Sequence, residues 1–291
     1  MKNVFQTSGA ALLSTLLVTM LACESAPPAG SAKKPVLLVV SFGTSFGDSR
    51  EKTIGAIERS LAAAFPEYEQ RRAFTSQIII DKLAEEDGLK IDNVEDAMKR
   101  LAADGVREVL VQPTHVMSGE EYDSVIEAIK PFESKFAGVK YGEPLLITDA
   151  DYDGVITAIT GEAGQYADDR TAVVFMGHGT EHEANATYAK LNQKIRDKGI
   201  SRYYIGTVEA SPSLEDVIAE IEETGGIARV VLLPLMIVAG DHANNDMAGD
   251  EPDSWKSVLE GLGYEAVPVL KGLGEYPGIR DIFVRHAREA R

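Results

Sequence analysis

Two histidines and one glutamate each stand shortly after an apolar run that has the character of a buried strand. His178 follows AVVFMG, Glu209 follows YYIGTV, and His242 follows VVLLPLMIVAG. Because the carboxyl ends of parallel strands meet at one edge of a sheet, these three side chains are expected to converge. Two imidazoles and one carboxylate are a reasonable ligand set for divalent cobalt, iron, nickel or zinc. The pattern predicts a metal site made of His178, Glu209 and His242.

More ordinary interpretations of the histidines stay open. A single histidine at a strand end is often only a hydrogen-bonded loop residue. His178 and His182 also form an H-x-x-x-H pair, which on a helix would share one face. Gly179 interrupts that pair, so we expect His182 in the first turn of the following helix, at the surface or in a cleft. His286, in RHAREAR, is expected on the solvated face of the last helix with no role.

Strand-like and helix-like segments alternate along the chain, and their order repeats. VVSFGTS parallels VFMGHGT, RRAFTSQIIIDKLAE parallels YYIGTVEASPSLEDVIAE, and REVLVQPTHVMSGEEY parallels ARVVLLPLMIVAGDHA. This alternation predicts an α/β fold of two similar halves, each a mainly parallel sheet flanked by helices, with a ligand cleft between their strand ends. We divide the chain into a signal peptide and linker (1–32), an N-terminal half (33–150) and a C-terminal half (151–291) that carries the metal site.

The first half lacks the metal-ligand pattern. At the places that correspond to the three candidate ligands it has Phe42, Thr75 and approximately Glu121, so it is free to shape the wall of the cleft. His115 lies at the end of the corresponding first-half strand, ahead of the acidic pair Glu120 and Glu121. Those carboxylates are favoured by the dipole of a following helix, so a purely structural turn at this point is the alternative to a direct role for His115.

The overall composition narrows the class of partner. The 291-residue chain is 44% apolar and 26% charged, as in ordinary soluble globular proteins, and its formal net charge is −17. Such a negative field disfavours nucleic acid and anionic membrane surfaces as partners, whereas it attracts cations. No H-E-x-x-H, C-x-x-C, G-x-G-x-x-G or phosphate-loop pattern is present. Zinc protease, dinucleotide and nucleoside-triphosphatase functions therefore lack their signatures.

The N-terminal residues predict an export signal. Lys2 precedes the apolar stretch GAALLSTLLVTMLA and the small, Pro-containing CESAPPAGSA. The stretch is too short to span a membrane, so no transmembrane segment is expected after processing. We expect a soluble periplasmic protein, with a lipid anchor on Cys23 and a buried helix of the mature fold as alternatives. Cys23 is the only cysteine, so the mature domain is expected to have neither disulfides nor thiolate metal ligands.

The chain resembles the anaerobic sirohydrochlorin cobaltochelatases of the CbiK type, relatives of the class II ferrochelatases. The resemblance lies in SFGTS, QPTHVMSGEEY, MGHGTEHEAN, GTVEASPS and LLPLMIVAGDHANNDMAGDEPDSW, and it extends from about Pro35 to the end of the chain. It implies two α/β halves of similar topology around a tetrapyrrole cleft. It also implies a metal site of two histidines and one glutamate, which the motifs place at His178, Glu209 and His242.

The activity implied by this resemblance is that of a lyase that inserts Co²⁺, or alternatively Fe²⁺, into sirohydrochlorin or a related tetrapyrrole. His178 and His242 would hold the metal on one side of the ring, and Glu209 would complete the site. One histidine, preferably His178, would accept a pyrrole proton, since an imidazole with an ordinary pKa of about 6.5 is largely neutral at pH 7.

The predicted export signal differs from what the resemblance implies, because cobalamin and sirohaem are assembled in the cytoplasm. A second function therefore stays open, that of a non-catalytic periplasmic protein that binds or transports a metal, haem or another tetrapyrrole. His115 is then a candidate axial ligand for haem at a surface or at a subunit interface of a homo-oligomer.

Overall fold

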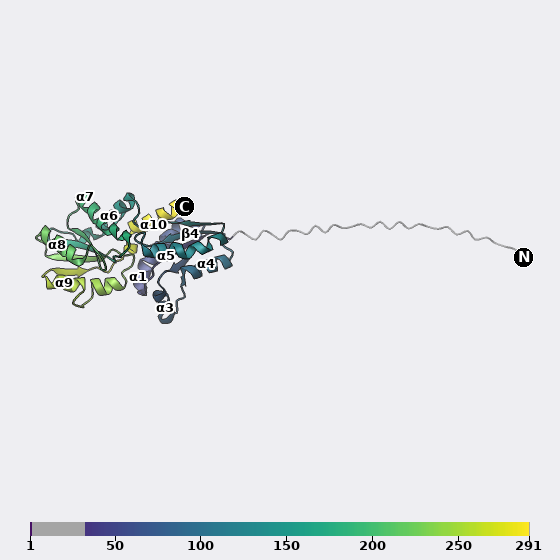
Figure 1. Ribbon diagram of the computed structural model, residues 1–291, viewed down its shortest axis with the longest axis horizontal. Helices are drawn as coiled ribbons and strands as arrows, with labels where there is room; N and C mark the ends of the chain where they lie inside the picture. Colours follow the sequence, from purple (N-terminus) through teal and green to yellow (C-terminus); the bar gives the residue numbers. More distant parts are fainter. Residues whose placement is uncertain (2–32, 291) are drawn as a thin grey trace. The chain divides into compact units, whose positions relative to one another are not determined.

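The described residues from Lys33 onward are built around two parallel sheets (Figure 1). The computed structural model describes Met1 and residues 33–290, and the part that begins at Lys33 forms one compact unit. The strands are β1 (Val36–Ser41), β2 (Glu69–Phe74), β3 (Asp92–Asn93), β4 (Glu108–Pro113), β5 (Gly138–Tyr141), β6 (Thr171–Gly177), β7 (Tyr203–Thr207), β8 (Arg229–Pro234) and β9 (Glu265–Pro268). The first sheet has the order β3-β2-β1-β4-β5 and the second β7-β6-β8-β9.

Helices connect the strands within each half. The α-helices are α1 (Gly47–Lys52), α2 (Ile54–Ala64), α3 (Gln77–Glu86), α4 (Val94–Ala103), α5 (Glu120–Ile129), α6 (Asp149–Ala163), α7 (Ala186–Asp197), α8 (Leu214–Thr224), α9 (Trp255–Gly261) and α10 (Pro277–Glu289). Short 3-10 segments are η1 (Lys130–Lys135), η2 (Gly164–Tyr166), η3 (Glu183–Asn185) and η5 (Leu273–Glu275), and η4 (Ala243–Met247) is a π-helical turn. Within the described residues, no helix is long and apolar enough to cross a membrane. The predicted export signal and Cys23 lie outside the described residues.

The two sheets share one strand order, which confirms the predicted fold class. In the first sheet β1 lies between β2 and β4, and in the second β6 lies between β7 and β8, with all of these pairs parallel. Every residue of β1 and β6 is buried, as expected for apolar strands covered by helices on both faces. The short strand β3 extends only the first sheet and was not predicted. The domain boundaries at 150 and 151 stay a prediction.

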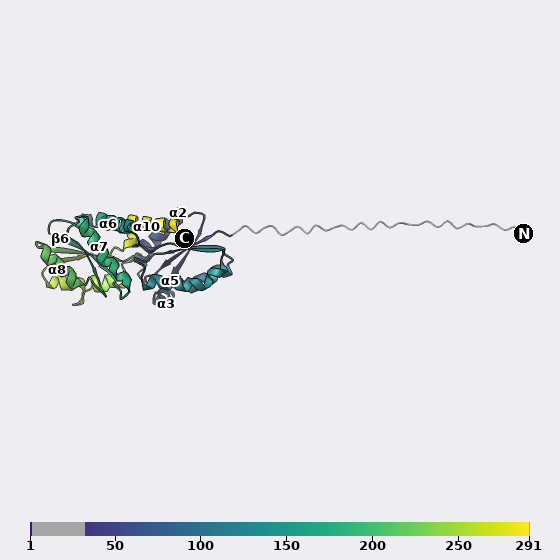
Figure 2. The same cartoon turned by 45° about the horizontal axis from the view of Figure 1, so that its top comes forward.

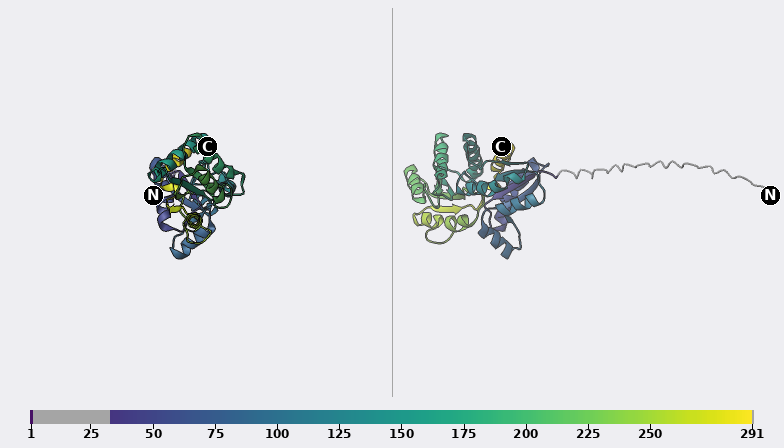
Figure 3. Two further views of the ribbon diagram at one scale, coloured as in Figure 1. Left: turned by 90° about the vertical axis from the view of Figure 1, so that its left-hand side faces the viewer. Right: turned by 45° about the vertical axis from the view of Figure 1, so that its right-hand side comes forward.

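One hydrophobic core runs across both halves. It contains buried side chains of β1 and β6 together with those of α2, α6, α7 and α10. Figure 2 shows α2, α6 and α10 on the same side of the molecule, and Figure 3 gives two further views. The opposite faces have separate cores, formed with α4 and α5 in the first half and with α8 and α9 in the second. The last helix therefore packs against α2 of the first half as well as α6 of the second.

Two helical segments differ from the expected pattern. Helix α6 was not predicted, and it begins at Asp149, beside the predicted boundary between the halves at residues 150 and 151. Thr148 and Asp151 form a capping box that starts it. The apolar residues of SREKTIGAIERSLAAAF follow the spacing of one helix, but the structure divides the segment into α1 and α2 at Thr53, whose hydroxyl donates to the carbonyl of Ser49.

The expected exposure of His286 is wrong. Its side chain is buried, with Nε2 2.9 Å from Asp151 Oδ1 and with Nδ1 donating to Glu143 O at 3.1 Å. Arg285 also donates to the fully buried carboxylate of Asp151. A terminal helix was expected to turn its charged residues to solvent, but α10 packs between the halves. Asp151, Arg285 and His286 thereby link α10 to the first turn of α6.

Candidate metal-binding site

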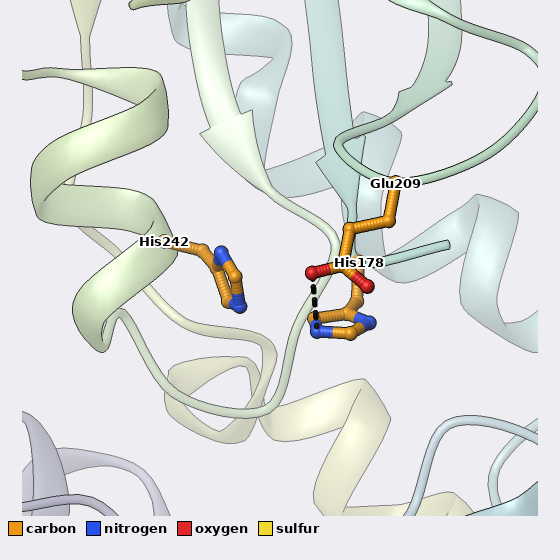
Figure 4. A group of neighbouring side chains, drawn as sticks. All are labelled: His178, Glu209 and His242. Carbon is orange, nitrogen blue, oxygen red and sulfur yellow. Dashed lines mark ion pairs between the residues drawn. The ribbon is translucent and has the colours of Figure 1, made fainter. Parts of the chain in front are cut away.

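His178, Glu209 and His242 meet beyond the carboxyl ends of the second-sheet strands (Figure 4). One potential ligand atom from each residue lies within 4.8 Å of those from the other two. Nε2 of His178 is 3.8 Å from Oε1 of Glu209, and the two imidazole rings lie edge to face with centroids 4.6 Å apart. Because metal bonds to nitrogen and oxygen are about 2.0–2.2 Å long, small side-chain movements would let all three atoms reach one ion.

The backbone holds His178 and Glu209 side by side. Beyond the end of β7, the amide of Val208 donates to Gly177 O at 3.0 Å and the amide of Glu209 donates to His178 O at 2.9 Å. His178 Nδ1 donates to Gly179 O at 2.7 Å, because a carbonyl oxygen can only accept. In the neutral ring, Nε2 therefore keeps a free lone pair. The first histidine is thus oriented with one nitrogen available to a metal or a proton.

His242 reaches the site from the π-helical turn that follows β8. Its Nδ1 is 2.8 Å from Asp246 Oδ2, one turn further along the chain. Asn245 Nδ2 donates to Asp241 Oδ1 at 3.0 Å and so ties the same turn together. The sequence reasoning missed Asp246. The available signal was its spacing of four residues from His242, which places two side chains on one face of a helical turn.

Glycine is needed on each side of His178, for a different structural reason at each position. A Cβ on Gly177 would lie 2.3 Å from Cε1 of Tyr188, whose buried ring packs against this position. Gly179 has a φ of +87°, a conformation that favours glycine, and a Cβ there would lie 2.8 Å from the backbone nitrogen of Ala210. Both glycines therefore let the His178 loop turn tightly against its neighbours.

We expect Gly177→Ala to destabilise the protein by about 1–3 kcal/mol, as overpacking of a core typically does. The added methyl group must displace Tyr188 or His178, so Co²⁺ binding should weaken as well. Denaturant unfolding and Co²⁺ titration measure the two effects. Gly161→Ala is the matched control, because a Cβ on this residue of α6 meets no atom within 4 Å. Equal stability of the two variants would contradict the steric argument.

The loops at the carboxyl ends of the two sheets contact each other. The amide of Ala239, in the second half, donates to Ser49 Oγ of the first half at 3.1 Å. His182 Nε2 lies 3.8 Å from Asp123 Oδ2 on α5. His178 is also among the charged groups that act on Glu121, at the start of α5. The metal-binding candidates thus face the first half.

Glu121 is the first-half carboxylate that this arrangement brings to the site. Its Oε2 accepts a hydrogen bond from Thr75 Oγ1 at 3.2 Å, so two of the predicted counterpart positions are in contact. Partial loss of hydration raises the pKa of the Glu121 carboxyl, while the bond from Thr75 and the charge of His178 oppose that rise. The third counterpart, Phe42, is 47% exposed directly after β1.

His182 lies at the start of a short helix and not in the three-residue cluster. Its Nδ1 accepts from the amide of Ala184 at 3.1 Å, so it caps η3, near the helix start where it was expected. Asn185 accepts from the amide of Thr180 and donates to Ser211 O, which anchors this loop to the one that follows Glu209. The H-x-x-x-H pair therefore does not form a two-histidine helical site in this structure.

His115 follows β4, where the sequence places it, and its side chain is buried. Its side chain is only 9% exposed, and neither ring nitrogen has a hydrogen-bond partner. Burial lowers the pKa of His115 to about 4, so the ring is neutral at ordinary pH. The amide of Leu145 donates to His115 O at 2.9 Å as the chain beyond β5 packs against this loop. A role as haem ligand stays a prediction and would require the ring to be uncovered.

Sequence comparison assigns this arrangement to a family. The sequence model of the family described as cobalt chelatase (CbiK) matches residues 35–291. The chain belongs to the cobalt chelatase (CbiK) family. The match includes both halves, all three metal-binding candidates and Glu121.

Two named relatives of this CbiK family member are similar over most of their length. The sirohydrochlorin cobaltochelatase of Salmonella typhimurium is 42% identical over 257 residues, which cover 88% of this chain and 96% of the relative. The sirohydrochlorin cobaltochelatase CbiKC of Nitratidesulfovibrio vulgaris is 34% identical over 261 residues, which cover 88% of this chain and 90% of the relative.

Solved structures share the fold at much lower sequence identity. SirB from Bacillus subtilis with Fe³⁺ aligns with a TM-score of 0.62 and 15% identity, covering 88% of this chain and 95% of that one. DR2241 from Deinococcus radiodurans, a multi-domain protein with structural similarity to chelatases, aligns with a TM-score of 0.60 and 13% identity, covering 89% of this chain and 55% of that one. These two solved structures therefore share the α/β fold of this family member.

Proposed function

We propose that this CbiK family protein is a chelatase that inserts Co²⁺ into sirohydrochlorin. The observation that carries the proposal is the convergence of ligand atoms from His178, Glu209 and His242 beyond three adjacent strands. The names of the two relatives support this pair of substrates. The ligand set accepts Co²⁺ without soft sulfur donors, in keeping with the preference of divalent cobalt for nitrogen and oxygen.

Metal insertion exchanges two pyrrole protons for one divalent cation. In the proposed reaction, His242 and Glu209 hold Co²⁺ after it loses part of its water, and the four ring nitrogens then replace the protein ligands. His178 accepts a pyrrole proton at Nε2, since its Nδ1 already donates to Gly179 O. The side chain of His178 is 48% exposed, so a substrate can reach it, and Glu209 lies close enough to attract the positive charge of the protonated ring.

Glu121 is placed to pass that proton onward. It belongs to the first half, the charge of His178 acts on its carboxyl to lower the pKa, and it is not one of the three clustered ligand residues. The pKa of its carboxyl is raised by partial loss of hydration, which brings its proton affinity closer to that of an imidazole. We infer that the carboxylate returns His178 to the neutral form between the two proton removals.

We expect Glu121→Gln to lower kcat by about tenfold or more, because an amide cannot carry the proton and general acid–base groups are commonly worth at least this much. Co²⁺ affinity should stay unchanged, since the three clustered ligand residues are intact. Glu120→Gln is the control, because this substitution also removes one negative charge, at the neighbouring residue. Stopped-flow absorbance and Co²⁺ titration separate the two effects. Equal kcat for the two variants would rule out the proton transfer.

Exposed aromatic side chains support a substrate with a flat, π-conjugated ring. Phe42 and Phe46 are exposed in the loop that follows β1, at the same end of the strands as Glu121. Large apolar side chains at a concave or facing surface commonly contact ligands, and aromatic rings stack on other π systems. We propose that Phe42 and Phe46 contact the macrocycle while the second half presents the metal.

The decisive experiment mixes the purified protein with sirohydrochlorin and Co²⁺ and follows the absorbance change of the tetrapyrrole. Insertion should be faster than the uncatalysed reaction and should show turnover. Absence of acceleration, with Co²⁺ still bound, would instead identify a non-catalytic metal or tetrapyrrole binder. Fe²⁺ in place of Co²⁺, under anaerobic conditions, tests the choice of metal in the same assay.

We further propose that this chelatase acts in the periplasm. The support is the Lys2-led apolar stretch and the small-residue segment after it. In a fractionated bacterial host, the full chain should be found in the periplasmic fraction, whereas a variant lacking residues 2–22 should stay in the cytoplasm. The same distribution of both chains would overturn the proposal.

A further inference from the structure

Asp246 contacts His242 at Nδ1, one of the two ring nitrogens. Oδ2 of Asp246 is 2.8 Å from Nδ1 of His242, within ordinary hydrogen-bond distance. An ionised carboxylate only accepts, so the proton of the neutral ring must lie on Nδ1. The lone pair then lies on Nε2, the nitrogen available to a metal ion.

The turn that carries Asp246 is held by hydrogen bonds within the turn and by packing against the core. Ala243 and Met247 are buried among the side chains that pack beneath the second sheet. The side chain of Asn244 donates to Gly240 O at 2.6 Å. The amide of Gly249 donates to Asn245 O at 2.9 Å, and a Cβ on Gly249 would lie 2.3 Å from that oxygen. Asp246 therefore stands on a turn whose backbone has little freedom to move.

The two histidines of the site have different supporting partners. His178 Nδ1 donates to the neutral carbonyl of Gly179, whereas His242 Nδ1 donates to a carboxylate. Hydrogen bonds to ionised acceptors are stronger than those to neutral ones. A carboxylate behind a metal-binding histidine also fixes the ring orientation and raises the donor strength of the other nitrogen. The two imidazoles are therefore unequal as metal ligands.

We propose that Asp246 is a positioning residue that holds His242 in the Nδ1–H tautomer and makes its Nε2 the anchoring donor for the divalent cation. The proposal rests on the proposed function in naming Co²⁺ as that cation. It assigns the metal chiefly to His242 and leaves His178 free for proton transfer. It also gives a role to Asp246, one of the three aspartates in GDHANNDMAGDE, which is not among the three metal-binding candidates.

The test compares the full chain with Asp246→Ala, Asp246→Asn and the control Asp241→Ala. Asp241 also contributes a carboxylate to this turn, but it bonds Asn245 and not the histidine. The tautomer of His242 is observed by long-range ¹H–¹⁵N NMR of histidine-labelled protein without metal, well above the ordinary histidine pKa of about 6.5. Co²⁺ affinity is measured by calorimetry on the same samples.

We expect Asp246→Ala to shift His242 toward the Nε2–H tautomer and to weaken Co²⁺ binding by about 10- to 100-fold. Asp246→Asn keeps an acceptor oxygen, so it should retain the Nδ1–H tautomer and recover part of the affinity. Because Asp246 and His242 are both partly exposed, the unfolding midpoint should change little.

The proposal is overturned if Asp246→Ala keeps the wild-type tautomer, or if its Co²⁺ affinity equals that of Asp241→Ala. Should the alanine variant fold poorly, Asp246→Asn against Asp241→Asn decides by the same two measurements. Neither measurement requires turnover. A protein that binds Co²⁺ but inserts no metal would therefore disprove the proposed function and leave this inference standing.

Discussion

Replacing His178 with alanine is expected to slow cobalt insertion by at least about 100-fold, since a positioned general base alone commonly contributes 10²- to 10⁴-fold. Because His242 and Glu209 hold Co²⁺ in the proposed reaction, Co²⁺ affinity should fall much less than kcat. Stopped-flow absorbance with saturating sirohydrochlorin gives the rate, and a Co²⁺ titration without tetrapyrrole gives the affinity. A fall in affinity with unchanged kcat at saturating metal would assign His178 to binding alone.

His182→Ala is the matched control for this prediction. It removes an imidazole from the same GHGTEH motif, but the removed ring caps η3 and faces Asp123 instead of joining the three-residue cluster. We expect its kcat to stay within about threefold of wild type, because partly exposed charge pairs contribute little. A loss as large as that of His178→Ala would mean that the H-x-x-x-H pair acts as a unit.

Replacing Asp151 with asparagine is expected to destabilise the folded protein by about 3 kcal/mol or more, because removal of one partner from a buried charge network has this effect. Asp151 is fully buried and accepts hydrogen bonds from Arg285, Thr148 and His286. Its loss weakens both the first turn of α6 and the attachment of α10. Urea unfolding monitored by circular dichroism measures the change.

The same carboxylate predicts a pH dependence with a definite sign. Burial alone would raise the pKa of Asp151, but the hydrogen bonds from Arg285, Thr148 and His286 outweigh it and hold the pKa well below its usual range. A carboxyl group with a depressed folded-state pKa stabilises the protein above its unfolded value of about 3.9. That contribution is lost as the pH falls below about 4.

The unfolding free energy of wild type should therefore decrease more steeply than that of Asp151→Asn between pH 5 and pH 3. Asp149→Asn is the control, since Asp149 lies on the same helix turn but is exposed and pairs with Lys190 and Lys194. Its stability should change little. Parallel pH profiles for wild type and Asp151→Asn would contradict the argument.

Much of the fold could be predicted because the central strands leave a strong local pattern. A strand covered by helices on both faces must be apolar throughout, and β1 and β6 are buried along their whole length. The repeat then located the equivalent strands, and the residues after β6, β7 and β8 supplied His178, Glu209 and His242. Helix α6 escaped prediction because its apolar period is weak in the sequence: glycines, threonines and alanines stand among its residues, and the buried Asp151 lies on its inward face.

Side-chain burial could not be predicted in the same way. His286 was expected in solvent, yet it is buried, and the burial of His115 was not predicted either. Their neighbours come from segments far away in the chain: Asp151 lies 135 residues from His286, and Leu145 closes over the His115 loop. The residues next to a histidine in the sequence do not indicate which distant helix or loop will pack against its side chain.

The sequence by itself therefore determined two parallel sheets flanked by helices and the three residues that meet beyond the strands of the second sheet. The reason is that buried strands and the helices between them produce local patterns of apolar residues. The tertiary structure alone decided that Thr75 donates to Glu121, that Asp246 contacts His242, and that Asp151 bonds the last helix. These contacts depend on side-chain direction and on the packing of segments that are far apart in the sequence. Hydrogen bonds require close approach of donor and acceptor, so these form only when the whole chain has folded.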